Sequence, residues 1–268
     1  MGLYAKYVLP PLIDLAMRNK DTARLRAECV PRACGEVVEI GIGSGLNLPF
    51  YSSDVQHVYG VDPSVELQQM ARKRSAMERI KVEFISQSAE EPLPLIDASI
   101  DTVVLTWTLC SIPDALRALQ QMKRILKPSG HLIFVEHGRS GDPGVEVWQD
   151  RITPLWKRIG GGCHLNRKID DLIEAAGFQI VELKTLYLPG PRLMTYTYQG
   201  IAQPGVNIQS EPATLSNQGE TRDESRIEGL AGTRREAEAD ANRETPRPAS
   251  LGRLKLGTSI VPEGQPDP

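Results

Sequence analysis

A glycine-rich turn that follows an apolar strand-like stretch constrains the fold of this chain more than any other feature. Residues 36–50 are Glu-Val-Val-Glu-Ile-Gly-Ile-Gly-Ser-Gly-Leu-Asn-Leu-Pro-Phe. Gly41, Gly43 and Gly45 permit positive φ and carry no Cβ, so the backbone can turn sharply and approach a ligand closely. The run therefore predicts a nucleotide-cofactor site at the end of a first strand.

The spacing of these glycines separates two classes of cofactor. The dinucleotide fingerprint Gly-x-Gly-x-x-Gly needs a third glycine at position 46, where this chain has leucine. Glu39, just before the turn, would repel a pyrophosphate but would favour a cationic amino-acid moiety. Asp62 ends a second apolar run, and a carboxylate there can accept hydrogen bonds from both hydroxyls of a ribose. A nicotinamide-dependent oxidoreductase is therefore a lesser alternative.

These two features belong to an ordered series of motifs. In chain order they are Val-Glu-Ile-Gly-Ile-Gly-Ser-Gly at 38–45, Val-Asp-Pro-Ser at 61–64, Ser-Ala-Glu at 88–90 with Leu-Pro at 93–94, Asp-Thr-Val-Val at 101–104 and Leu-Lys-Pro-Ser-Gly-His at 126–131. The series covers roughly positions 36–200 and resembles the class I S-adenosylmethionine-dependent methyltransferases. A lone glycine loop would be weak evidence, whereas five elements in this order are specific.

The resemblance implies both the fold and the cofactor. The implied fold is α/β and Rossmann-like, with a doubly wound, seven-stranded, mostly parallel sheet in which the last hairpin makes one strand antiparallel. The implied cofactor is S-adenosylmethionine, with S-adenosylhomocysteine as product. The family often has aspartate where this chain has Ser88, although a hydroxyl can still bond an adenine amine. The implied cofactor-binding residues are Glu39, Gly41, Gly43, Gly45, Asp62, Pro63, Ser88, Ala89, Glu90 and Thr106.

Hydrophobic patterning independently predicts alternating strands and helices after the glycine turn. Expected helices cover 66–74, 114–126, 145–158 and 169–176, and expected strands cover 80–85, 101–106, 131–136, 178–188 and 192–201. Ser64 is a candidate N-cap, residues 127–130 are an expected helix stop, and Gly177 is expected to end the helix before it. Alternation of this kind is typical of a doubly wound sheet.

We expect three parts in the chain: an N-terminal helical cap at 1–35, the methyltransferase domain that the resemblance implies at 36–202, and a tail at 203–268 that composition sets apart. The tail has no aromatic residue, cysteine, histidine or methionine, and so we expect it to be disordered. It carries eight Lys+Arg and 11 Asp+Glu, which leaves 31 − 8 = 23 and 34 − 11 = 23 in the rest. A neutral body disfavours a nucleic-acid partner and favours a small-molecule acceptor.

The remaining features suggest a cytoplasmic protein without a metal site. The cysteines at 29, 34, 110 and 163 form no C-x-x-C pair, so we expect reduced thiols and predict no metal ligation. No apolar run approaches the roughly 18 residues of a membrane span. The apolar residues of segment 1–35 predict amphipathic helices that pack on the sheet, cover the active site or make peripheral membrane contact. The oligomeric state is left open.

The resemblance also implies the acceptor side: this superfamily often contacts the acceptor directly after the fourth strand, where Trp107 and Cys110 lie, and Glu136 and Trp148 belong to the subgroup motifs given below. Trp107, Cys110, Glu136 and Trp148 are the expected substrate-binding residues. The Asn-Pro-Pro-Tyr or Asp-Pro-Pro-Tyr turn of amide methyltransferases is replaced by Thr-Trp-Thr-Leu at 106–109, which disfavours a planar amide or base as acceptor.

Motifs outside the core resemble the methyltransferase-like 7 subgroup, whose animal members are associated with S-methylation of alkyl thiols at membranes. These motifs are Leu-Cys-Ser at 109–111, Glu-His at 136–137, Trp148, Pro-Leu-Trp-Lys at 154–157 and Ile-Gly-Gly-Gly-Cys-His-Leu-Asn-Arg at 159–167. A thiol must lose its proton before attack, and His137 and His164 are the candidate catalytic bases. Cys110 and Cys163 are more simply interpreted as small core residues, because direct displacement needs no enzyme nucleophile.

The sequence thus predicts a methyltransferase that uses S-adenosylmethionine to methylate a small, apolar acceptor, with a thiol as the first choice. The alternative is a quinone-precursor C-methyltransferase or a phospholipid N-methyltransferase, because the core motifs also resemble the ubiquinone and menaquinone enzymes. A protein that binds S-adenosylmethionine without catalysis is a further alternative.

Overall fold

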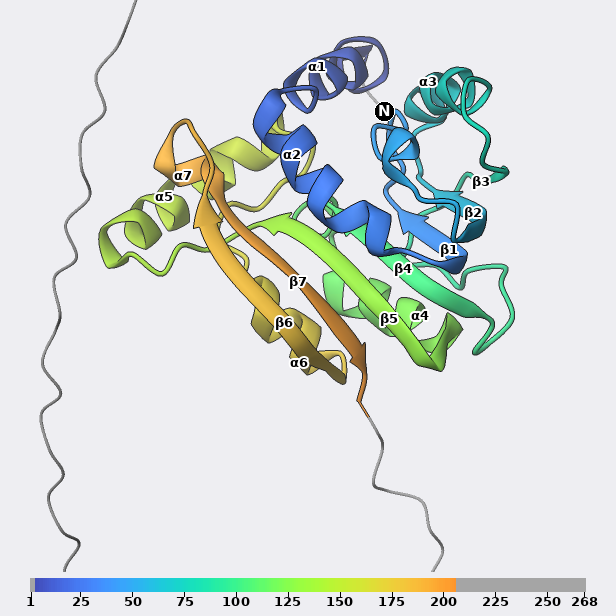
Figure 1. Cartoon of the computed structure of the whole chain (residues 1–268). Coiled ribbons are helices and arrows are strands. Elements are labelled where there is room, and N and C mark those ends of the chain that lie inside the picture. Colours follow the sequence, from blue (N-terminus) through green and yellow to red (C-terminus); the bar gives the residue numbers. More distant parts are fainter. Residues whose placement is uncertain (1–2, 206–268) are drawn as a thin grey trace, which may run out of the picture. The chain divides into compact units, whose positions relative to one another are not determined.

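Seven strands form one mixed sheet in the computed structural model, which describes residues 3–205 of the chain (Figure 1). The strands lie in the order β3-β2-β1-β4-β5-β7-β6, and β7 runs antiparallel to both of its neighbours while the other pairs are parallel. This arrangement confirms the predicted doubly wound sheet with one reversed strand. The bounds are β1 (Gly35–Ile40), β2 (Val55–Val61), β3 (Val82–Ile85), β4 (Ile100–Thr106), β5 (Leu126–His137), β6 (Phe178–Tyr187) and β7 (Tyr196–Pro204).

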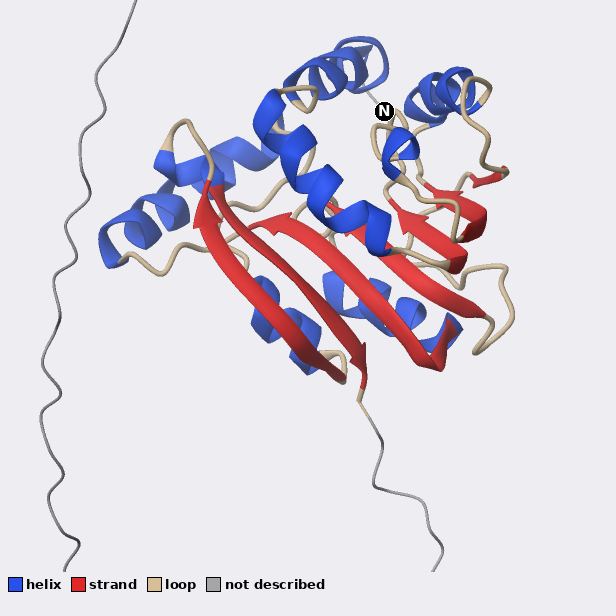
Figure 2. Ribbon diagram, in the orientation of Figure 1, coloured by secondary structure: helices blue, strands red, loops and turns tan. Residues whose placement is uncertain are grey.

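Helices cover both faces of the sheet (Figure 2). The α-helices are α1 (Leu9–Ala16), α2 (Lys20–Cys29), α3 (Val65–Ser75), α4 (Ala115–Ile125), α5 (Pro143–Ile159), α6 (Ile169–Ala175) and α7 (Arg192–Thr195). Shorter turns are the π-helix η1 (Tyr4–Val8) and the 3₁₀ helices η2 (Val30–Arg32) and η3 (Leu48–Phe50). No helix within residues 3–205 is long and apolar enough to cross a membrane.

The two faces follow from the alternation of side chains along the central strands. Val38, Val103 and Leu132 point to one side and pack into the same buried cluster as residues of α4 and α6. Their neighbours Val37, Val104 and Ile133 point to the other side and share a cluster with Leu25 of α2. Figure 1 shows α2 in front of the sheet and α4 and α6 behind it. Both faces are covered, which explains the nearly continuous apolar run of β4.

The predicted helix boundaries are confirmed by local contacts. The Ser64 hydroxyl accepts a hydrogen bond from Leu67 N at 3.3 Å at the start of α3. Asp114 accepts one from Arg117 N at 3.0 Å at the start of α4. Gly177 follows α6 with φ +83°, the left-handed conformation that glycine adopts most readily.

Three sequence predictions differ from the structure. Residues 127–130 were expected only to stop a helix, but β5 begins at Leu126, and its residues 127–130 bulge between the partners of Ile100 and Thr102. Residues 192–195 were expected in a strand, but they form α7, because Met194 N bonds to the Pro191 carbonyl at 2.9 Å. The tail was expected to begin at position 203, but strand β7 continues to Pro204. Residues 206–268 of the predicted tail lie outside the described residues.

Candidate active site

A cavity of about 300 Å³ lies beyond the carboxyl ends of β1, β2 and β4. The strand order changes direction at β1, which places this crevice at the topological switch point where ligands of doubly wound sheets bind. Its wall is formed by the glycine turn after β1, the end of β2, the loop after β3, the turn after β4, the helices α1 and α2, and Gly160 and Gly161.

The three glycines of the turn have different tasks. All have positive φ, of +73°, +52° and +80° for Gly41, Gly43 and Gly45. A Cβ on Gly41 would lie 2.2 Å from Thr108 Oγ1, so this position must remain glycine for β1 and β4 to end side by side. A Cβ on Gly43 would meet no atom closer than 3.8 Å, and Gly43 borders the cavity. Gly45 does not line the cavity, because it packs against Leu48 and Ala71.

Asp62 borders the cavity at the end of β2 with only 7% of its surface exposed. Its Oδ2 accepts a hydrogen bond from Gly43 N at 3.0 Å, and its Oδ1 accepts one from Ser64 N at 2.8 Å. Burial raises the pKa of this carboxyl, and the two backbone N–H groups oppose that rise. Each oxygen retains a lone pair for a ligand hydroxyl, and Pro63 borders the cavity beside it.

Glu39 is the most buried acid of the cavity, with 1% of its surface exposed. Asn47 Nδ2 donates to its Oε1 at 2.9 Å, and the Tyr51 hydroxyl donates to its Oε2 at 2.8 Å. Burial raises the pKa of Glu39 to about 8, against the hydrogen bonds from Tyr51 and Asn47 and the charge of Arg26. A cationic ligand would shift this carboxyl toward its charged form.

Arg26 and Asn47 belong to the site but were not predicted. Arg26 Nε donates to Asn47 Oδ1 at 3.0 Å, and its guanidinium lies 4.8 Å from the ring centre of Trp107. Burial lowers the pKa of Arg26 to about 10, and the charge of Glu39 opposes this. Asn47 follows the glycine turn directly, which was a signal for its role, whereas nothing in the sequence of α2 marks Arg26.

Helix α1 covers one side of the cavity through Ile13, Asp14 and Met17. The buried carboxylate of Asp14 accepts hydrogen bonds from the hydroxyl of Ser44 in the glycine turn and, at 2.8 Å, from Arg74 Nη2 of α3. Burial would raise the pKa of Asp14, but these bonds and the one from Arg18 outweigh it and lower the pKa. In the sequence, Asp14 is an acid within an otherwise apolar N-terminal stretch, and this contrast could have indicated its buried role.

The loop after β3 contributes two of its three predicted residues to the cavity wall. Ser88 and Ala89 border the cavity. Glu90 does not; its carboxylate accepts hydrogen bonds from the Ser88 hydroxyl at 2.8 Å and from Asp114 N at 2.6 Å. The side chain of Glu90 therefore ties the loop to the start of α4.

The turn after β4 brings Thr106 and Trp107 to the cavity wall. Trp107 has φ +51°, a conformation rare for a bulky residue, and its N–H bonds to the Val135 carbonyl at 2.8 Å. Glu136 does not line the cavity. Its fully buried carboxylate accepts hydrogen bonds from the backbone N–H groups of Thr108 at 2.7 Å, Leu109 at 2.9 Å and Cys110 at 3.4 Å, and burial raises its pKa to about 7. Glu136 thus shapes the turn from behind.

The predicted bases and the remaining acceptor residues lie outside the cavity wall. His137 Nε2 is 3.3 Å from Cys163 Sγ, and His164 Nδ1 is 3.1 Å from the Cys110 carbonyl oxygen. Cys110 is buried behind the turn after β4. None of these four residues borders the cavity.

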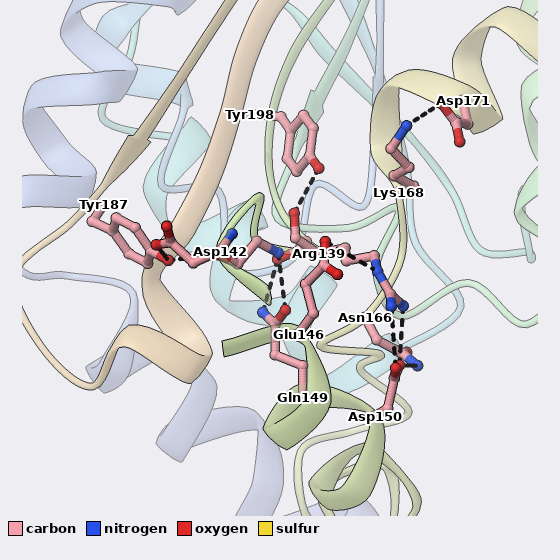
Figure 3. A network of polar contacts seen from close by, with 12 residues as sticks. Arg139, Asp142, Glu146, Gln149, Asp150, Asn166, Lys168, Asp171, Tyr187 and Tyr198 are labelled. Atoms are coloured by element: carbon pink, nitrogen blue, oxygen red, sulfur yellow. Dashed lines mark hydrogen bonds and ion pairs between the residues drawn. The ribbon is translucent and has the colours of Figure 1, made fainter. Parts of the chain in front are cut away.

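Trp148 lies on α5, is half exposed and is also absent from the cavity wall. A polar network holds this helix against the ends of β5 and β6 (Figure 3). Gln149 Nε2 donates to the Gly138 carbonyl at 3.0 Å, Arg139 pairs with Asp150, and Tyr187 donates to Asp142 at 2.6 Å. The network fixes α5, while Val147, Trp148 and Leu155 of this helix remain about half exposed or more.

Comparisons with known proteins agree with this geometry. A family model described as a methyltransferase domain matches residues 38–134. Thiol S-methyltransferase TMT1B of Rattus norvegicus is 38% identical over 168 residues, which cover 59% of this chain and 68% of that protein. Thiol S-methyltransferase TMT1B of Homo sapiens is 32% identical over 203 residues, which cover 71% of this chain and 83% of that protein. A crystal structure of an S-adenosylmethionine-dependent methyltransferase from Thermotoga maritima shares the fold, with a TM-score of 0.53 and 23% identity over 74% of this chain and 98% of that one.

Proposed function

Because this chain belongs to the class I S-adenosylmethionine-dependent methyltransferases, we propose that its acceptor is a small, apolar thiol. Two relatives that share about a third of their residues with it are named thiol S-methyltransferases. The observation that carries the proposal is the apolar part of the cavity wall, next to the part suited to the cofactor.

The first part of the wall fits S-adenosylmethionine. The cavity volume of about 300 Å³ is within the range of small-molecule sites. In our assignment Glu39 and the turn at Gly41 and Gly43 hold the amino-acid portion, and the two oxygens of Asp62 accept from the ribose hydroxyls. Ser88 and Ala89 lie beside the adenine in this assignment.

The second part of the wall is suited to an uncharged, apolar acceptor. It consists of Ile13, Met17, Trp107, Ile112 and Pro113, which come from α1 and from the turn after β4. Such a wall excludes water from a thiol and its alkyl group. It offers no carboxylate pair or amide turn to orient a planar base.

The reaction itself demands positioning more than acid–base chemistry. Bound S-adenosylmethionine supplies a methyl group on a positively charged sulfur, which is displaced in line by the acceptor atom. The thiolate is the attacking form, and the guanidinium of Arg26 in the cavity wall favours a thiolate over a thiol. His137 and His164, by contrast, lie outside the wall and contact Cys163 and the Cys110 carbonyl.

Labelled S-adenosylmethionine tests the proposal. The full chain is incubated separately with a series of short alkyl thiols, with demethylquinones and with phosphatidylethanolamine, and the labelled product is identified. We expect transfer to alkyl thiols, with a rate that rises with pH as the thiolate fraction of the acceptor increases. Label transferred only to the quinone or to the lipid amine would replace the proposed acceptor. Cofactor binding with no transfer to any of them would favour a non-catalytic protein.

A further inference from the structure

Three side chains with metal-binding atoms meet behind the turn after β4. Cys110 follows that turn, His137 is the last residue of β5, and Cys163 belongs to the loop after α5. One ligand atom from each residue lies within 4.8 Å of the other two, and Cys163 Sγ is 3.3 Å from His137 Nε2. Cys110 and His137 are buried, and the mechanism proposed above uses none of the three.

We propose that Cys110, His137 and Cys163 bind one thiophilic divalent cation, with Zn²⁺ as the expected ion. Two sulfurs and one imidazole are the ligand types that zinc prefers, and tetrahedral bonds of about 2.3 Å to sulfur and 2.0 Å to nitrogen separate ligand atoms by roughly 3.5–3.8 Å. The Cys163–His137 pair lies at 3.3 Å and all three ligand atoms lie within 4.8 Å of one another, so small side-chain adjustments would complete such a site. Magnesium and calcium prefer oxygen ligands and are excluded by this donor set.

The charges of the site would balance. Zn²⁺ displaces the two thiol protons to solvent, so two thiolates compensate the cation in a buried position. The nearest carboxylate, that of Glu136, already accepts three backbone hydrogen bonds and holds the turn rather than the ion. Three protein ligands leave a fourth coordination position for water or another small ligand.

The site would fasten the loop after α5 to the turn after β4. These segments already touch, since His164 N donates to the Cys110 carbonyl at 2.8 Å and Arg167 donates to the Ile112 carbonyl at 2.6 Å. Ser111 on one side and Gly161 on the other belong to the cavity wall. A metal at this place would therefore fix part of the wall, whichever acceptor the enzyme uses.

Metal content tests this proposal without an activity assay. The full chain, purified under reducing conditions without chelators, is loaded with Zn²⁺, desalted and analysed by elemental mass spectrometry. We expect about one zinc per chain. The double variant Cys110→Ser/Cys163→Ser should retain at most about one fifth of the zinc that the wild-type chain retains. The control Cys29→Ser/Cys34→Ser should retain it, because Cys34 is exposed and Cys29 accepts a hydrogen bond from Gln199 that serine also accepts.

Cobalt supplies a second measurement on the unaltered chain, which decides the question if the double variant does not fold. Co²⁺ bound here should give thiolate-to-cobalt charge-transfer absorption together with tetrahedral ligand-field bands. Failure of the reduced wild-type chain to take up either ion would overturn the proposal. A Cys110–Cys163 disulfide found by peptide mapping in metal-free protein would also overturn it, if reduction of that disulfide does not restore metal binding. Equal zinc content in a folded double variant would also overturn it.

Discussion

At the scale of single residues, two buried carboxyl groups at the ends of neighbouring strands differ in how the protein holds them. Glu39 and Asp62 both border the cavity, yet their partners differ. Asp62 receives two backbone N–H groups, whereas Glu39 receives the side chains of Asn47 and Tyr51. Asp62 is therefore held by the backbone of the fold. Glu39 is held by side chains, so a substitution of Asn47 or Tyr51 can change the pKa of its carboxyl.

Asp62→Asn should weaken the binding of S-adenosylhomocysteine by about 1–3 kcal/mol, roughly five- to 150-fold, because an amide cannot accept from two hydroxyls while also accepting from Gly43 and Ser64. Isothermal titration calorimetry of both proteins measures the change. Asp171→Asn is a matched control, since this exposed acid on α6 pairs with Lys168 and lies outside the cavity wall. An unchanged dissociation constant for Asp62→Asn would contradict the ribose assignment.

Glu39 should make the binding of S-adenosylmethionine depend on pH. With a pKa near 8 the carboxyl is mostly protonated at neutral pH, and a cationic ligand favours its ionised form. Affinity relative to the Glu39→Gln variant should therefore rise by roughly tenfold between about pH 6.5 and about pH 8.5. The ratio of the two dissociation constants at each pH cancels titration of the ligand itself. A ratio that stays flat would show that Glu39 does not titrate against the ligand.

The sequence predicted the residues of this site that occur in motifs and missed those that arrive through packing. Glu39 was found because it lies just before the glycine turn, and Asp62 and Ser88 because they follow β2 and β3 at family spacings; all three border the cavity. Arg26 was missed because a helix before the first strand carries no motif, and only the fold brings it onto Trp107. Cys110 was placed at the acceptor from its position after β4, and Glu136 from a motif of the methyltransferase-like 7 subgroup. Their side chains point away from the cavity wall, which strand position alone does not determine.

At the scale of elements, the turn after β4 is held by one buried side chain, that of Glu136. Glu136→Ala would leave the N–H groups of Thr108, Leu109 and Cys110 without their acceptor and should lower the free energy of unfolding by about 2–4 kcal/mol. Glu136→Gln keeps one acceptor oxygen and should lose less. Urea denaturation of the three proteins measures the difference. Equal stability of the alanine variant and the wild type would mean that water replaces the carboxylate.

Helix α1 should loosen when its buried anchor is removed. Asp14 is the polar contact of α1 with both the glycine turn and α3, so Asp14→Asn should weaken the bonds to Ser44 and Arg74. We expect backbone amides of residues 12–16 to exchange hydrogen at least about tenfold faster, with a smaller loss of cofactor affinity. Glu28→Gln on α2 is the control, because the polar partners of this exposed acid are Arg24 and Gln199, neither of them in α1. Unchanged exchange would show that apolar packing alone holds α1.

Elements were easier to predict than the points where they bend. Strands and amphipathic helices with a continuous period, such as β4 and α4, agree with the structure within a residue or two. The bulge at residues 127–130 and the short helix α7 depend on how β5 and β7 pair with neighbours distant in the sequence. A hydrophobic period contains no information on such pairing.

At the scale of the whole molecule, apolar side chains gather outside the cavity on two neighbouring elements. Leu12 and Leu15 of α1 and Trp148 and Leu155 of α5 are each about half exposed or more. The segment η1, which directly precedes α1, touches the end of α5, because the Tyr4 hydroxyl donates to the Ile159 carbonyl at 3.1 Å. We expect these exposed apolar side chains to face a membrane surface, an orientation that suits an acceptor that partitions into lipid.

Vesicle binding tests that orientation. The full chain should sediment with phosphatidylcholine vesicles, and Leu12→Ser/Leu15→Ser should reduce the bound fraction at least about fivefold, because each leucine loses up to roughly 2 kcal/mol of apolar transfer free energy. Neither leucine borders the cavity, so transfer to a water-soluble thiol should persist in this variant. Leu116→Ser on α4, behind the sheet, removes a partly exposed leucine from another surface and should bind vesicles like the wild type. Equal binding by both variants would place the membrane contact elsewhere, and no binding by the wild-type chain would remove it.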